Sequence, residues 1–171
     1  MKTDVLLVDG YNIIGAWPEL RRIKEERLAD ARDRLIERMA EYKAHSGWRV
    51  IVVFDAYLMP GIEKKKRHHN VEIIFTRENE TADERIEKLV SELGSRRVQI
   101  HVATSDLTEQ WVIFAQGALR KSARELEIEI DEIDKIITAK VKKFQEQRPF
   151  SKISLTNEIA ETFEKWRRGM K

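Results

Sequence analysis

Four short runs of apolar residues, separated by segments with helical periodicity, constrain the fold of this chain more than any other feature. The runs are rich in Val and Ile and occupy residues 5–8, 50–54, 71–75 and 98–102. Short β-branched runs are typical of strands, and strands that alternate with helices are typical of a parallel sheet. The sequence therefore predicts an α/β fold with a mostly parallel central sheet that helices cover on both faces.

The segments between the runs carry helix signals. After the first run, apolar residues recur at helical spacing from Leu28 to Tyr42, and we expect this helix to end near Gly47. A capping-box pattern over residues 81–84 opens a second helix, which we expect to end at Gly94. A further start signal at residues 106–109 predicts a third helix that ends near residue 117.

The last third of the chain gives more mixed signals. Residues 122–125 have a capping pattern, residues 126–130 predict a late strand, and a helix is expected from Asp131 onward. Pro149 interrupts this helix, and apolar residues at helical spacing follow it in the tail. We therefore expect one domain over residues 1–148, with residues 149–171 as a C-terminal helical extension of the same domain.

Composition narrows the classes of function. The chain has 171 residues, enough for one domain with a substantial core, and no cysteine, which excludes disulfides and thiolate metal ligands. Its 32 Lys and Arg nearly balance 30 Asp and Glu, so only local clusters could indicate nucleic acid binding. The first apolar run stops at Asp9, far too early to span a membrane. We expect a cytoplasmic protein without a membrane association.

Carboxylates follow the predicted strands. Asp9 and Asp55 come directly after the first two runs, Asp83 begins the helix after the third, and Asp106 follows the fourth. Because the carboxyl ends of parallel strands meet at the edge where open α/β folds bind ligands, we expect these side chains to gather there. Helix capping is the structural alternative for Asp83 and Asp106. Asp9 and Asp55 follow buried runs and need a partner.

An acidic edge of this kind favours a divalent cation. Clustered carboxylates raise one another's pKa unless a cation or hydrogen bonds offset the repulsion. Oxygen ligands in a chain without cysteine favour Mg²⁺ or Mn²⁺, and such an ion supports phosphodiester hydrolysis. Asn12, three residues after Asp9, either orients a ligand or caps the segment in which it lies. The number of ions is left open.

Other phosphate-handling folds fit the sequence less well. A receiver domain needs paired acidic residues after the first strand, but Gly10 follows Asp9. A phosphatase of the Asp-x-Asp type needs an acid where this chain has Tyr11. The glycine loops G-x-G-x-x-G and G-x-x-x-x-G-K-[ST] of nucleotide-binding folds are absent. Carboxylates without a phosphate-binding glycine loop favour a nuclease.

As an ordered set, five motifs resemble the NYN family of PIN-like metal-dependent ribonucleases, and most closely its bacterial YacP-like branch. The motifs are VDGYNIIG, VVFDAY, ETADERIE, VATSD and GALRKSAREL, which all lie within residues 5–126. The resemblance implies a PIN-like three-layer fold and endoribonuclease activity. It also implies that Asp9, Asp83 and Asp106 match the acidic metal-site positions, with Asn12 as the family asparagine and Asp55 as the second-strand aspartate. Finally, it implies mRNA as substrate and an association with the translating ribosome.

Two clusters of basic residues are candidates for binding RNA. The first lies in the connection between the second and third runs, where we expect a loop, and comprises Lys64, Lys65, Lys66 and Arg67. The second, Arg120 and Arg124, falls within GALRKSAREL and could also face a protein partner. Clustered cations gain affinity for phosphates by releasing counterions, although a solvated surface is the structural alternative for the first cluster. Tyr11 or Tyr57 could stack on an unpaired base, or could be part of the core.

The leading hypothesis is a cytoplasmic endoribonuclease dependent on Mg²⁺ or Mn²⁺, with Asp9, Asp83 and Asp106 at the metal and Asp55 and Asn12 in support. The alternative is a non-catalytic RNA- or ribosome-binding module with the same fold. The sequence leaves the oligomeric state open.

Overall fold

A six-stranded sheet forms the centre of the molecule. The computed structural model describes residues 1–56, 64–106, 112–147 and 157–169. The sheet order is β3-β4-β2-β1-β5-β6, and all strands except β3 are parallel to their neighbours. The strands are β1 (Thr3–Asp9), β2 (Arg49–Phe54), β3 (Lys64–His68), β4 (Val71–Phe75), β5 (Val98–Ala103) and β6 (Leu119–Lys121). Each of the four predicted strands is confirmed.

Helices cover both faces of the sheet, as predicted. The helices of the described residues are α1 (Gly10–Ala16), α2 (Pro18–Glu26), α3 (Leu28–Ser46), α4 (Ala82–Leu93), α6 (Ala123–Gln147) and α7 (Asn157–Arg167), of which α1, α2, α3, α4 and the first turns of α6 pack on the sheet. The helix expected before Gly47 is α3, and Gly47 ends it with a φ of 73°. The capping box of Thr81 and Glu84 opens α4. Of the third predicted helix, residues 112–115 are helical, and residues 107–111 lie outside the described part of the chain.

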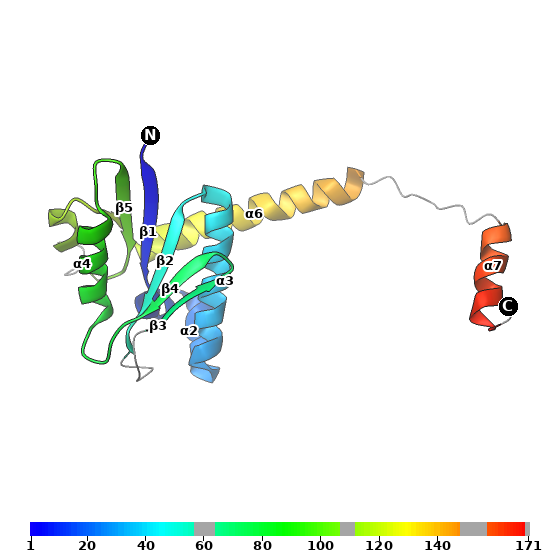
Figure 1. Ribbon diagram of the computed structural model, residues 1–171, viewed down its shortest axis with the longest axis horizontal. Helices are drawn as coiled ribbons and strands as arrows, with labels where there is room; N and C mark the ends of the chain where they lie inside the picture. The colour runs from blue at the N-terminus through cyan, green and yellow to red at the C-terminus, as the bar shows by residue number, and fades with distance from the viewer. Residues whose placement is uncertain (57–63, 107–111, 148–156, 170–171) are drawn as a thin grey trace. The chain divides into compact units, whose positions relative to one another are not determined.

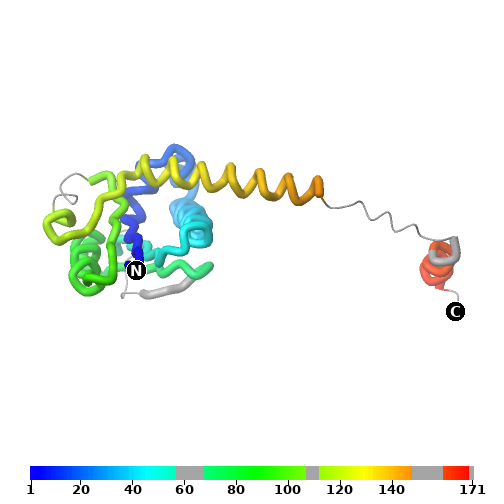
Figure 2. Tube along the Cα trace, turned by 90° about the horizontal axis from the view of Figure 1, so that it is seen from above, coloured from blue at the N-terminus to red at the C-terminus, as the bar shows by residue number. Residues whose placement is uncertain are grey.

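Two apolar clusters, one on each face of the sheet, make up the core. One joins alternate residues of β1 and β2 to α1, α2, α3 and the first turns of α6. The other joins the remaining residues of β1 and β2, with Ile100 and Val102 of β5, to α4. Figure 1 shows α4 on one side of the strands and α2 and α3 on the other, and Figure 2 shows the same separation from above. The PIN-like three-layer arrangement expected from the sequence is thus present.

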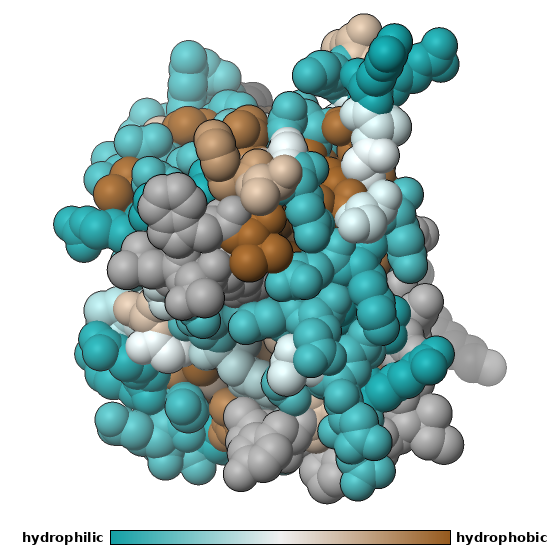
Figure 3. Space-filling view, turned by 90° about the vertical axis from the view of Figure 1, so that its left-hand side faces the viewer, coloured by the Kyte–Doolittle hydropathy of each residue, from teal (hydrophilic) through white to brown (hydrophobic). Residues whose placement is uncertain are grey.

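The surface on the α4 side of the molecule is mostly hydrophilic, with hydrophobic side chains gathered in a few patches (Figure 3). In the helical turn at residues 112–115, Ile113 is buried in the α4 cluster, whereas Val112 and Phe114 are exposed. Ile113 is therefore the apolar side chain through which this turn packs on the α4 cluster.

Two sequence predictions were wrong. Residues 64–68 form the edge strand β3 and not a loop, because His69 and Asn70 both adopt positive φ angles, 50° and 65°, and close a hairpin with β4. Residues 126–130 lie in α6 and do not form a strand. The alternation of apolar and polar residues over 126–130 was misleading, because two of its apolar residues also fit helical spacing. Leu126 and Ile130, with Ile133 in the next turn, form the buried stripe of the helix.

The chain forms two compact units, residues 1–134 and 135–171. The first unit contains the whole sheet. The second contains the end of α6 and α7, which confirms the predicted helix in the tail. The predicted boundary at residue 148 stays a prediction. Among the described residues, no helix is both long enough and apolar enough to cross a membrane.

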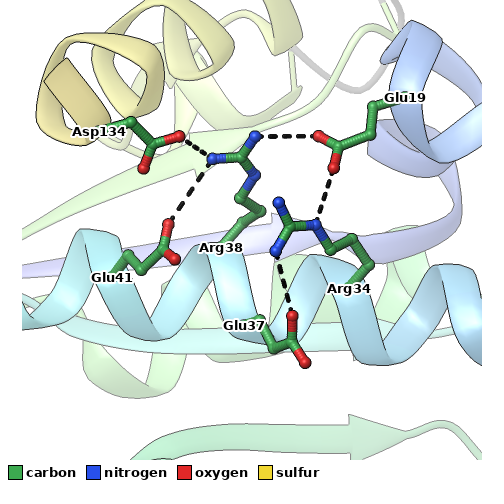
Figure 4. A network of polar contacts seen from close by, with 6 residues as sticks. All are labelled: Glu19, Arg34, Glu37, Arg38, Glu41 and Asp134. Atoms are coloured by element: carbon green, nitrogen blue, oxygen red, sulfur yellow. Dashed lines mark hydrogen bonds and ion pairs between the residues drawn. The ribbon is translucent and has the colours of Figure 1, made fainter. Parts of the chain in front are cut away.

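A network of charged side chains ties α2, α3 and α6 together within the first unit (Figure 4). Arg38 of α3 is at its centre, because its guanidinium donates to Glu19 of α2 at 3.0 Å and also to Asp134 of α6. Arg34 donates to the other oxygen of Glu19 at 2.7 Å. The network joins α2 and α3 to α6 at Asp134, near the middle of that helix.

Glu41 is the destabilising member of this network. Burial and the neighbouring Asp134 carboxylate raise the pKa of Glu41, although Arg38 lies 3.7 Å away. A raised pKa means that ionisation costs free energy in the folded state, so the penalty is absent at low pH and appears as the pH rises through the folded pKa. We expect Glu41→Gln to stabilise the protein at pH 7 by a few tenths of a kcal/mol, since solvent screens a partly exposed group. The gain should vanish near pH 4.

Thermal unfolding at the two pH values measures this difference. Glu37→Gln is the matched control on the same helix, because the more exposed Glu37 accepts a hydrogen bond from Arg34 at 3.1 Å and gains nothing from neutralisation. A gain for Glu41→Gln that persists undiminished at pH 4 would contradict the assignment.

Candidate active site

Three of the predicted aspartates follow the three neighbouring strands at the middle of the sheet. Asp9 ends β1, Asp55 follows β2, and Asp106 comes three residues after β5. β1 pairs with both other strands, with Asp9 opposite Val53 and Val8 opposite Ala103. The carboxyl ends of these strands are therefore level, and the three segments leave the sheet at the same edge.

The alternation of side chains along β1 gives the face on which the Asp9 carboxylate lies. Leu7 belongs to the apolar cluster under α4, and Asp9 is two residues after it in the same strand, so Asp9 follows the same alternation toward α4. Asp55 lies just beyond the end of β2 and interacts electrostatically with Tyr11 of α1. Asp9 is only 8% exposed, and Asp55 is half-buried.

The turn after Asp9 requires a glycine. The chain passes from β1 to α1 with no loop, and a Cβ at Gly10 would lie 2.3 Å from the ring of Phe54. Phe54 is fully buried and packs on Tyr11 and Phe75, at ring distances of 5.0 and 5.4 Å. The absence of a side chain at residue 10 therefore lets α1 begin at the sheet and keeps Asp9 at its edge.

Asp83 occupies the first turn of α4, the helix that starts at the same edge after β4. Thr81 Oγ1 accepts from the Glu84 backbone at 3.2 Å and Glu84 reaches back to Thr81, so the cap is provided by residues other than Asp83. Capping therefore does not account for an aspartate at this position, and the favourable interaction with the helix dipole stays its structural alternative.

Glu80, which lies just before α4 at the same edge, has a structural role. Its buried carboxylate accepts from Arg85 at 2.9 Å and from Lys88 at 3.0 Å. Burial alone would raise the pKa of Glu80, but the hydrogen bonds from Lys88 and Arg85 lower it. Glu80 thus pairs with two cations of α4.

Asn12 connects α1 to the loop that carries Asp106. Its Oδ1 accepts from both the backbone N–H and the hydroxyl of Ser105, at 2.6 and 2.8 Å. The Asp106 backbone N–H in turn donates to buried Thr104 at 3.1 Å. Asn12 therefore neither caps α1 nor is free to turn, and it holds the Asp106 loop against the end of β1. Sequence reasoning missed this bond because its partners are far apart in the chain.

The edge presents the donor chemistry of a site for a hard cation, since it has carboxylate and amide oxygens and the chain has no cysteine. Asp9, Asp55, Asp83 and Asp106 all have interactions within the protein. Within the described ranges, no three His, Asp or Glu side chains are grouped closely enough to hold a metal ion. The shared edge is thus observed, and metal binding by Asp9, Asp83 and Asp106 stays a prediction.

The two basic clusters lie at opposite edges of the sheet. Lys64, Lys65, Lys66 and Arg67 are in the edge strand β3, whereas Arg120 is exposed in the other edge strand, β6. Arg124 is exposed in the first turn of α6. In the order of the sheet, the three strands that the aspartates follow lie between the two edges.

The two tyrosines proposed for base stacking differ in what the structure describes. Tyr11 is half-buried against Phe54, and its hydroxyl accepts from Arg32 at 3.1 Å. Burial raises the pKa of Tyr11 despite this contact. It is thus partly a core residue. Tyr57 lies outside the described residues.

Comparisons with known proteins agree with one another. The family model of the YacP-like NYN domain matches residues 6–168. The protein YacP of Bacillus subtilis is 60% identical over 166 residues, which cover 97% of this chain and 98% of YacP. The crystal structure of Rae1 (YacP) from Bacillus subtilis superposes with a TM-score of 0.77 at 60% identity, covering 98% of this chain and 96% of that one. A variant of Rae1 with one tryptophan replaced by leucine gives a TM-score of 0.75 at 56% identity over the same shares.

Proposed function

Because this chain belongs to the YacP-like NYN domain family, a PIN-like nuclease family, we propose that it is a cytoplasmic metal-dependent endoribonuclease that cleaves mRNA in association with the translating ribosome. The observation that carries the proposal is the common edge of Asp9, Asp55 and Asp106 after three neighbouring strands, with Asp83 at the start of α4 beside it.

In this proposal Asp9, Asp83 and Asp106 hold Mg²⁺ or Mn²⁺. When bound, such an ion stabilises charge on a phosphate during hydrolysis. Asp9 is fixed by its position at the end of a central strand. Asn12 fixes Asp106 indirectly by holding Ser105, and Asp55 supports Asp9 from the neighbouring strand. Four carboxylates at one edge repel RNA phosphates unless a cation is present, so binding of the ion and of the substrate are expected to depend on each other.

The basic edges support RNA as the substrate class. β3 carries Lys64–Arg67 on one side of the acidic edge, and β6 and α6 carry Arg120 and Arg124 on the other. Cations on both sides of an acidic centre attract the flanking phosphates of a strand that crosses it.

A divalent ion is expected to stabilise the wild-type protein and to leave Asp9→Asn unchanged. A ligand at ten times its dissociation constant stabilises a folded protein by about 1.4 kcal/mol, which corresponds to a rise in Tm of about 3 °C for a chain of this size. Thermal unfolding with and without millimolar Mn²⁺ measures the shift. Asp131→Asn, an exposed aspartate of α6, is the control and should respond like the wild type. Equal shifts in wild type and Asp9→Asn would remove Asp9 from the metal site.

A further inference from the structure

A cavity of about 370 Å³ adjoins the acidic edge on the side of β6 and α6. One wall is apolar and comes from the junction of α1 and α2, at Trp17 and Pro18. The other wall is polar and comes from Ser105, Arg120 and Arg124. Glu127 also lines it. Its residues come from three distant parts of the chain, so no local sequence signal marks the cavity.

Ser105 joins the cavity to the proposed active site. It lines the cavity, its neighbour in the chain is Asp106, and its backbone and hydroxyl both donate to Asn12. A ligand in this cavity would therefore lie beside the segment that carries one of the proposed metal ligands.

The walls are fixed in the protein alone. The Trp17 ring N–H donates to the carbonyl of Ala123 at 2.8 Å, and this buried bond connects the apolar wall to the start of α6. Ser122 and Glu125 cap α6 reciprocally, at 2.8 and 3.1 Å, and hold the turn that carries Arg124. A cavity whose walls are already in place costs little ordering entropy when a ligand binds.

The two arginines lack anionic partners in the part of the chain that the structure describes. Arg34, Arg38, Arg49 and Arg85 each form an ion pair with a carboxylate. Arg120 and Arg124 form none there, although both are on the cavity wall. Guanidinium groups bind phosphates through paired N–H donors, so two of them in one cavity make a phosphate the expected ligand.

The shape of the cavity narrows the ligand further. Its volume is at the lower end of the range for small-molecule sites, which suits a single nucleotide and not a duplex. The arginines suit the phosphate, and the apolar wall suits the ribose and base. We propose that this cavity binds one nucleotide of single-stranded RNA next to the cleaved bond, with its phosphate on Arg120 and Arg124. This inference rests on the proposed function, because it takes RNA as the substrate.

The test compares RNA binding by the wild type and by Arg120→Gln/Arg124→Gln. Fluorescence anisotropy with a labelled single-stranded RNA gives Kd at several salt concentrations, with Ca²⁺ in place of Mg²⁺ or Mn²⁺ so that a cation offsets the carboxylates without supporting cleavage. We expect the variant to bind at least tenfold more weakly. The slope of log K against log salt should fall by about 0.7, the value for one phosphate contact in a single strand. In cleavage assays with Mn²⁺ the variant should raise KM and leave kcat nearly unchanged.

Arg96→Gln/Arg97→Gln is the matched control, because it removes the same charge from two exposed arginines just before β5, at the amino edge of the sheet. If the Arg120/Arg124 variant and this control bind RNA with equal Kd, the proposal is overturned. This holds even if the Arg120/Arg124 variant no longer binds a protein partner. The two proposals fail separately. If the wild type cleaves RNA but the arginines do not contribute to binding, the proposed nuclease function is retained and the proposed nucleotide site is rejected. Arginine-dependent binding without cleavage, both with and without active translation, retains the site and removes the nuclease.

Discussion

Asp9→Asn and Asp83→Asn are each expected to fold normally and to reduce RNA cleavage by about a hundredfold or more. Both changes keep the size of the side chain and remove the negative charge that a metal ligand needs. Metal ions contribute several kcal/mol to catalysis of this kind, and each 1.36 kcal/mol is a factor of ten in rate. Asp106→Asn should behave in the same way. Asp55→Asn should lose less, because Asp55 is proposed to support Asp9 and not to hold the ion.

The assay incubates purified protein with Mg²⁺ and an mRNA, with and without active translation, and maps the new RNA ends. Cleavage in both conditions indicates a free nuclease, and cleavage only during translation indicates one that requires the ribosome. Asp131→Asn is again the control for loss of one negative charge. Full cleavage by the Asp9→Asn/Asp83→Asn double variant would refute the proposed site, and binding without cleavage by the wild type would favour a non-catalytic module.

Gly10→Ala is expected to destabilise the protein by about 1–3 kcal/mol, the usual cost of overpacking a core. The added methyl group would lie 2.3 Å from the Phe54 ring, which is fully buried and cannot move aside freely. Gly15→Ala is the matched control on the same helix. A Cβ at Gly15 meets nothing within 4 Å, so this change should stabilise α1 by up to about 1 kcal/mol through helix propensity.

A double-mutant cycle identifies the cause of the Gly10 effect. Phe54→Leu removes the ring, so Gly10→Ala should cost much less in that background than in the wild type. Denaturant unfolding of the four proteins gives the coupling energy. Strict additivity would show that the ring is not what excludes a side chain at residue 10.

The sequence was most informative where the signals were local. The apolar runs predicted four strands, the Thr81–Glu84 pattern predicted the start of α4, and Gly47 predicted the end of α3. Each depends on residues within a few positions of one another. The common edge of the aspartates was predictable for the same reason, since it follows from strand ends in a parallel sheet.

The failures came from residues whose environment is set at a distance. β3 consists of three lysines, an arginine and a histidine at the edge of a sheet, where charge is favourable but the apolar alternation of a strand is lost. In α6 the run Leu126–Ile130 fits both the two-residue period of a strand and the 3.6-residue period of a helix. The packing of its buried residues in the cluster with α1 and the sheet favours the helix. The Asn12–Ser105 bond and the cavity at Arg120 depend on chain topology, which pattern reading does not supply.

The place of β1 between β2 and β5 has a consequence for the order in which the molecule is made. β1 is the first strand to be synthesised, but its two neighbours are Arg49–Phe54 and Val98–Ala103. A growing chain that ends before β5 has Asp9, Asp55 and Asp83, yet it lacks Asp106 and the Ser105 that Asn12 holds. Under the proposed function, a growing chain that lacks β5 and Asp106 is therefore inert, because its acidic edge is incomplete.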